Sequence, residues 1–108
     1  MEKKGMLVIM AQVPPDKEEA FHHWYNDEHL PRVLELLPGV VSGRSYKIME
    51  GDEEYQFMAL YEFLSYEALN AALDSEAMKR LIQEYDEAFG KGGRKRLKTV
   101  RIDSLIGG

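Results

Sequence analysis

The first third of the chain changes from the hydrophobic period of a strand to that of a helix. Residues 5–13 form a short apolar run that two prolines end, as expected of a largely buried strand. Asp16 can cap a helix that follows and runs to about Leu30. Pro31 has no amide hydrogen for the helical ladder, so we expect a kink or break there and one last turn over residues 33–37.

The rest of the chain repeats this change of period. Residues 40–49 and 55–63 have strand character, and the acidic, glycine-containing turn between them predicts a hairpin. Residues 65–89 predict a helical region that begins at a serine cap, has a second cap at residue 74 or 75, and ends at a glycine. After a basic loop, residues 97–106 predict a last strand whose apolar side chains we expect to be buried.

This order of elements indicates a fold class. Strand, helix, strand, strand, helix, strand is the split βαβ arrangement, which predicts an α+β, ferredoxin-like βαββαβ fold with a four-stranded antiparallel sheet. Right-handed crossovers would place both helical regions on one side of that sheet. The chain has 108 residues and is expected to form a single domain over residues 1–108, because one core of this size buries roughly two-thirds of the unfolded surface.

Both faces of the expected sheet are apolar. In residues 55–63, one face carries Tyr55, Phe57, Ala59, Tyr61 and Phe63, and the other carries Met58 and Leu60. A face in contact with water should be polar, and an exposed apolar patch of several hundred Å² is unusual for a monomer. We therefore expect a two-fold homodimer in which the sheets of two copies face each other, forming a dimeric α/β barrel.

Composition narrows the classes of function. The chain is 44% hydrophobic and 31% charged and has no cysteine, which excludes disulfides, thiolate nucleophiles and cysteine-ligated metal clusters. Its net charge of -5 disfavours nucleic acid as a partner, and we interpret the basic residues 91–98 as a solvated loop leading into a strand, although they could meet phosphate. No apolar run is long enough for a membrane span or a signal peptide, so the expected location is the cytoplasm.

Candidate chemistry is concentrated in the segment FHHWYNDEHLPRV, Phe21 to Val33, which holds all three histidines. At about 100° per residue, one face of this helix collects Phe21, Trp24, Tyr25, Glu28 and His29. An imidazole among aromatic rings can act as a general acid or base, so His29 and Glu28 are the predicted catalytic residues. The alternative is structural: His29 donates to a backbone carbonyl at the kink, and Glu28 pairs with an arginine, Arg44 or Arg101.

A small-molecule site would need apolar walls with a few polar groups. The predicted substrate-binding residues are Trp24, Tyr25, Phe21, Tyr46, Arg44, Met10 and Met58. Each also has a simpler explanation as a packing residue. We expect no metal and no cofactor, because His22 and His29 are seven residues apart, or ~10 Å along a helix, too far to hold one ion together.

Two stretches resemble a known family. WYNDEHLPRVLELLPGVVSGRSYKI, residues 24–48, resembles the EthD-like branch of the dimeric α/β-barrel superfamily, in which a WY-x-x-EH-x-P helix end precedes a PGV-x-S-x-R-x-Y strand. FLSYEALNAALDSEAMKRL, residues 63–81, is similar to the second helical region of that family. The resemblance implies a ferredoxin-like subunit whose sheet pairs with a second copy, with a cavity between the first helix and the sheet.

The resemblance leaves the reaction open, because the superfamily includes monooxygenases, lactone isomerases, cyclases and haem-degrading enzymes. We expect a cofactor-independent enzyme or binding protein in which His29 transfers protons on an apolar, aromatic or polyketide-like small molecule. One alternative is a non-catalytic dimeric accessory or stress-related protein, in which the aromatic cluster stabilises the helix end. Another is a cofactor-less or haem-linked monooxygenase.

Overall fold

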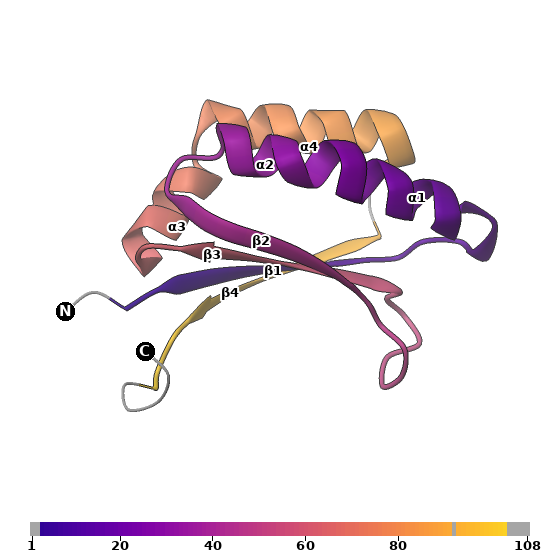
Figure 1. Ribbon diagram of the computed structural model, residues 1–108, viewed down its shortest axis with the longest axis horizontal. Coiled ribbons are helices and arrows are strands. Elements are labelled where there is room, and N and C mark those ends of the chain that lie inside the picture. The colour runs from indigo at the N-terminus through magenta and orange to yellow at the C-terminus, as the bar shows by residue number, and fades with distance from the viewer. Residues whose placement is uncertain (1–2, 92, 104–108) are drawn as a thin grey trace.

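The computed structural model describes residues 3–91 and 93–103 and has the predicted order of elements (Figure 1). The strands are β1 (Gly5–Ala11), β2 (Val40–Lys47), β3 (Phe57–Phe63) and β4 (Arg94–Val100). The helical elements are a 3₁₀ turn η1 (Pro15–Lys17), α1 (Glu18–Trp24), a π-helical turn η2 (Tyr25–His29), α2 (Leu30–Leu36), α3 (Tyr66–Leu73) and α4 (Glu76–Phe89). The strands form one antiparallel sheet in the order β2-β3-β1-β4. The predicted α+β, ferredoxin-like fold is confirmed.

The helices all lie on one side of the sheet, as expected (Figure 1). The continuous helix from α1 to α2 runs beside α4, and α3 packs at one end of the sheet (Figure 1). On β3 the four residues that face the helices are at most 8% exposed. They are Phe57, Ala59, Tyr61 and Phe63. Tyr55, expected on the same face, precedes the strand and is half-buried.

The opposite side of the sheet, which we call the outer sheet face, has Val8, Met10, Met58 and Leu60 at its centre. These residues pair across β1 and β3, Val8 with Leu60 and Met10 with Met58, so they share one face. All four are half-buried, and no element of the described residues covers them. The expectation of two apolar faces is therefore confirmed.

Serine caps begin both helices of the second helical region. The side-chain oxygen of Ser65 accepts a hydrogen bond from the amide of Ala68 at 3.0 Å, and that of Ser75 accepts from the amide of Met78 at 3.2 Å. Each serine satisfies an amide that the first turn of a helix leaves without a partner. Gly90 follows α4 with a φ of 86°, a conformation that glycine adopts without strain.

Of the kink or break expected at Pro31, the break is wrong, because the helix continues through the proline as α2. The amide of Leu30 donates to the carbonyl of Tyr25, five residues earlier, which is a π-type bond. After this inserted residue, Pro31 occupies the first turn of α2, where a missing amide hydrogen is tolerated. The expected cap at Asp16 is also absent: Asp16 lies within η1, and neither η1 nor α1 has a side-chain cap.

The last strand begins three residues earlier than predicted, so the basic residues 94–96 belong to β4 instead of a loop, and it ends at Val100 instead of continuing through residues 101–103. The expected burial of its apolar residues is also wrong, since Val100 is 43% exposed and Ile102 is 82% exposed. Leu105 and Ile106 lie outside the described residues. β4 is an edge strand that pairs only with β1, and charged side chains are common on such strands. Within the described residues, no helix is long and apolar enough to cross a membrane.

Candidate functional site

The π-helical turn decides which side chains of residues 25–29 face the interior. A π turn inserts one residue relative to an α-helix, so the following residues are rotated back by roughly 100°. His29 is thereby turned toward the sheet and is 7% exposed, whereas Glu28 is exposed to solvent. The expectation that Glu28 faces the interior beside His29 is wrong for this reason. His23 is exposed, as predicted.

Aromatic rings surround the His29 imidazole. It stacks on Trp24, with ring centroids 4.7 Å apart and an interplanar angle of 19°, and its centroid lies 5.1 Å from that of Tyr25 and 5.9 Å from that of Tyr85. Its Nδ1 is buried and has no hydrogen-bond partner among the described residues, so the expected bond to a backbone carbonyl is not made by this atom. Because burial disfavours the charged form, the pKa of His29 falls from 6.5 to about 4, and the ring is neutral at pH 7.

Two tyrosines form a hydrogen-bonded pair beside His29. The hydroxyl oxygens of Tyr25, from η2, and Tyr61, from β3, lie 2.5 Å apart. Burial raises the pKa of both phenols well above 10, so both are protonated at neutral pH. One hydroxyl donates to the other, and a second O–H remains that makes no hydrogen bond with the described residues. The pair can therefore donate to a ligand.

Arg94 reaches the same region from the start of β4. Its Nη2 donates to Oδ1 of Asp86 at 2.5 Å, and its guanidinium carbon lies 4.2 Å from the centroid of the Tyr85 ring. Burial raises the pKa of Tyr85 to about 12. The carboxylate and the ring together hold the guanidinium in a fixed orientation, with further N–H donors left over.

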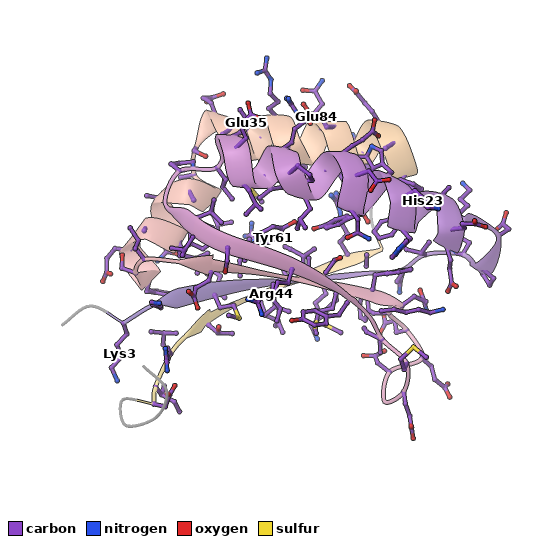
Figure 2. All side chains as sticks on the ribbon, in the orientation of Figure 1. Lys3, His23, Glu35, Arg44, Tyr61 and Glu84 are labelled. Atoms are coloured by element: carbon purple, nitrogen blue, oxygen red, sulfur yellow. The ribbon has the colours of Figure 1, made fainter. Side chains whose placement is uncertain are left out.

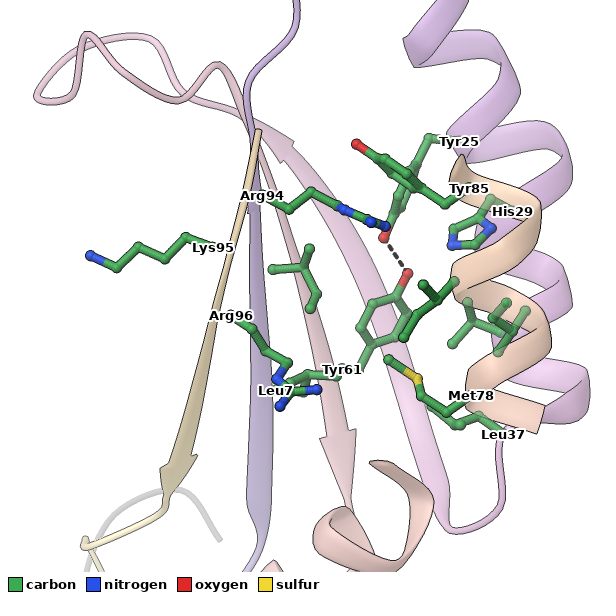
Figure 3. A pocket seen from close by; sticks show the side chains of 14 residues that line it. Leu7, Tyr25, His29, Leu37, Tyr61, Met78, Tyr85, Arg94, Lys95 and Arg96 are labelled. Carbon is green, nitrogen blue, oxygen red and sulfur yellow. Dashed lines mark hydrogen bonds between the residues drawn. The ribbon is translucent and has the colours of Figure 1, made fainter. Parts of the chain in front are cut away.

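These groups border a cavity of about 150 Å³ between the helices and the sheet (Figure 3). Its polar lining consists of His29, Tyr25, Tyr61, Tyr85, Arg94, Lys95 and Arg96, and its apolar walls include Leu7, Val33, Leu37, Met78 and Leu81. Among the lining residues, Ile82 on α4 and Arg96 on β4 are exposed to solvent. The cavity therefore opens between α4 and the edge strand.

The residues predicted to bind a substrate are divided between the two faces of the sheet. Phe21, Trp24 and Tyr25 lie on the helix side with His29, where Phe21 packs 5.5 Å from Tyr25, ring centroid to centroid. Tyr25 lines the 150 Å³ cavity, while Phe21 and Trp24 pack behind it. The remaining predicted residues, Tyr46, Arg44, Met10 and Met58, lie on the outer sheet face. Figure 2 shows Tyr61 and Arg44 on opposite sides of the sheet, so the structure does not bring all the predicted residues into one site.

The polar lining residues that were not identified from the sequence include Tyr61, Tyr85, Arg94 and Arg96. A signal existed for the two tyrosines. The spacing of apolar residues places Tyr61 on the buried face of its strand and Tyr85 on the buried face of its helix, and a buried hydroxyl needs a hydrogen-bond partner. The arginines had no such signal. Assigning them to a loop concealed the alternation that directs residues 94 and 96 toward the helices.

The chain matches one family of known proteins. The family model described as "Domain of unknown function (DUF4286)" matches residues 5–97. No functionally curated protein matches the sequence.

Solved structures show the same fold. An EthD family protein from Bacillus halodurans is 20% identical, with a TM-score of 0.74 over 92% of this chain and 99% of that one. An EthD-like protein from Ralstonia eutropha is 15% identical, with a TM-score of 0.70 over 92% of each chain. A dimeric protein of unknown function with a ferredoxin-like fold from Bacteroides fragilis is 8% identical, with a TM-score of 0.64 over 91% of this chain and 96% of that one. The expected resemblance to EthD proteins is confirmed at the level of the fold.

Proposed function

This chain belongs to the family described as a domain of unknown function, DUF4286, and from the geometry of its cavity we propose that it binds a small, largely apolar molecule and exchanges a proton with it through His29. The observation that carries the proposal is the imidazole itself. It is neutral at pH 7, forms part of the cavity wall and has a buried nitrogen that no described residue hydrogen-bonds. A buried polar atom of this kind needs an explanation, and a role in binding or catalysis is one that the cavity beside it favours.

The size of the cavity favours a ligand with one ring. A cavity of about 150 Å³ lined by aliphatic and aromatic side chains can hold a benzene-sized molecule. A larger polyketide-like ligand would extend through the opening between α4 and β4. The apolar walls would bind the body of the ligand, and the few polar groups would orient it.

The polar groups suggest proton transfer next to a carbonyl. The neutral imidazole can accept a proton from carbon, and the spare hydroxyl of the Tyr25–Tyr61 pair can donate to the carbonyl oxygen on which negative charge develops. An imidazole with a pKa of about 4 is a weak base, so a ligand that raises this pKa would also increase its reactivity.

We further propose that two copies pair through the outer sheet face. Its apolar centre is not covered by any of the residues that the structure describes, and the similar Bacteroides fragilis protein is described as dimeric. Pairing would remove this apolar surface from water and leave the cavity, which lies on the other side of the sheet, open to ligands.

Binding and chemistry are tested by titrating the protein with a panel of one-ring and short aliphatic carbonyl compounds. Ligand entry should shift the imidazole NMR signals of His29, and His29→Phe should abolish any proton exchange while preserving the stacking on Trp24. His23→Phe is the matched control, because His23 is exposed. If no compound perturbs His29, and His29→Ala only lowers the melting temperature, the cluster is structural and the accessory-protein alternative is correct.

A further inference from the structure

The opening of the cavity carries positive charge on a chain that is negative overall. Arg94 and Arg96 are alternate residues of β4, and both extend toward the cavity, whereas Lys95 between them points away from it (Figure 3). The whole chain has a net charge of -5. The chain as a whole therefore does not attract anions, and a preference for them depends on local positive groups such as those at this opening.

The two arginines differ in how their charge is compensated. Arg94 is paired with Asp86, at 2.5 Å between Nη2 and Oδ1. Arg96 makes no hydrogen bond or ion pair with the described residues, and the residue paired with it on β1 is the apolar Ile9. Lys95 also borders the cavity, but its side chain points away from it, so the side chains directed into the opening carry one net positive charge. That charge belongs to a guanidinium whose donors are available to a ligand.

From these charges and the cavity volume, we propose that the site selects small monocarboxylates, with the apolar body inside the cavity and the carboxylate bound to Arg96 at its opening. This inference rests on the function proposed above and names its ligand class. A guanidinium presents two parallel N–H donors to a carboxylate, and one net charge at the opening matches one negative charge. A phosphate ester with two negative charges would be only half compensated.

Such a ligand would also act on His29. A carboxylate bound at the opening of the same cavity brings a negative charge toward the imidazole, which favours its protonated form. The pKa of His29 would then rise from about 4 toward neutrality, where a general base works best. Ligand charge and proton transfer would in this way be coupled.

The test compares benzoate with benzamide, which has nearly the same size and no charge. Calorimetric titration of the wild-type chain should show benzoate binding about tenfold or more tightly than benzamide, the effect expected of one charged hydrogen-bonding group. Arg96→Gln should remove this preference by weakening benzoate and leaving benzamide unchanged. Lys98→Gln, the matched control on the same strand but outside the cavity lining, should leave both affinities as in the wild type.

The outcomes separate this inference from the function on which it rests. Equal binding of benzoate and benzamide, with His29 perturbed by both, would overturn the carboxylate preference and leave the binding site intact. Tighter binding of phenyl phosphate than of benzoate, or an equal effect of Lys98→Gln and Arg96→Gln, would also overturn it. If neither benzoate nor benzamide binds, or both leave the His29 signals unchanged, the carboxylate assignment fails, and failure of the whole carbonyl panel would remove the proposed site as well.

Discussion

The imidazole of His29 stacks on the indole of Trp24, with ring centroids 4.7 Å apart and planes inclined by 19°. Trp24 is the only tryptophan of the chain. Trp24 is the last residue of α1 and His29 the last of the π-helical turn η2, which turns the His29 ring onto the indole. Changes at His29 can therefore be followed by indole fluorescence as well as by NMR.

His29 should make stability depend on pH between its two pKa values. The folded pKa is about 4 and the reference value is 6.5, so the unfolded chain binds the proton more readily in this range. Stability should be greatest above pH 6.5 and fall as the pH decreases toward 4, by up to roughly 3 kcal/mol. Urea unfolding from pH 7.5 to pH 4 should show this slope in the wild type.

His29→Phe keeps an aromatic ring on Trp24 but cannot titrate. The difference between the stability profiles of the wild type and His29→Phe therefore reports the titration of His29 alone, because the carboxylates contribute equally to both. His23→Phe should leave the wild-type slope in place, since His23 is exposed. Parallel profiles for the wild type and His29→Phe would show that the pKa of His29 is not lowered.

The Tyr25–Tyr61 pair should show strong coupling. Tyr61→Phe leaves the buried hydroxyl of Tyr25 without its partner, at a cost of about 1–3 kcal/mol in the free energy of unfolding. Adding Tyr25→Phe removes that orphaned group, so the double variant should be less destabilised than the sum of the single variants. Denaturant unfolding of the four proteins measures this interaction. Simple additivity would contradict the observed hydrogen bond.

Gly43 leaves space for the Tyr61 ring. A Cβ at this position would lie 2.9 Å from Cδ1 and Cε1 of Tyr61 and 3.1 Å from Cδ2 of Leu34. Gly43→Ala should therefore displace the ring and destabilise the fold by roughly 1–3 kcal/mol. It should also weaken ligand binding, because Tyr61 lines the cavity. Ser42→Ala, on the opposite face of β2, should have little effect in the same unfolding and titration measurements.

The outer sheet face should hold two copies together. Burying about 500 Å² of apolar surface per chain would contribute roughly 12 kcal/mol before the entropic cost of association. Sedimentation equilibrium at micromolar concentration should give twice the 12.4 kDa of one chain. Leu60→Lys, at the centre of this face, should shift the equilibrium to the monomer, whereas Met49→Lys, at an already exposed position, should not. A monomeric wild type would contradict the proposed pairing.

Much of the fold could be predicted from the sequence because local patterns determine it. The alternation of Phe57, Ala59, Tyr61 and Phe63 has the period of a strand with one buried face, whatever covers that face. The serines before α3 and α4 provide their caps within three residues of sequence. The order of the elements then leaves few topologies, and the observed one is the arrangement that connection rules favour.

The candidate site depends on features that local patterns do not contain. A uniform rotation of 100° per residue placed Glu28 and His29 on the same face, but the π turn rotates one outward and the other inward. Arg94 and Arg96 reach the cavity because β4 pairs with β1 in a register set by backbone hydrogen bonds between residues about 90 positions apart. The sequence alone determined the sheet, its helices and its apolar faces, since each follows from the period of neighbouring residues. The tertiary structure decided which side chains share the cavity, because that depends on the phase of a helix and the register of an edge strand, and both are settled by packing between distant segments.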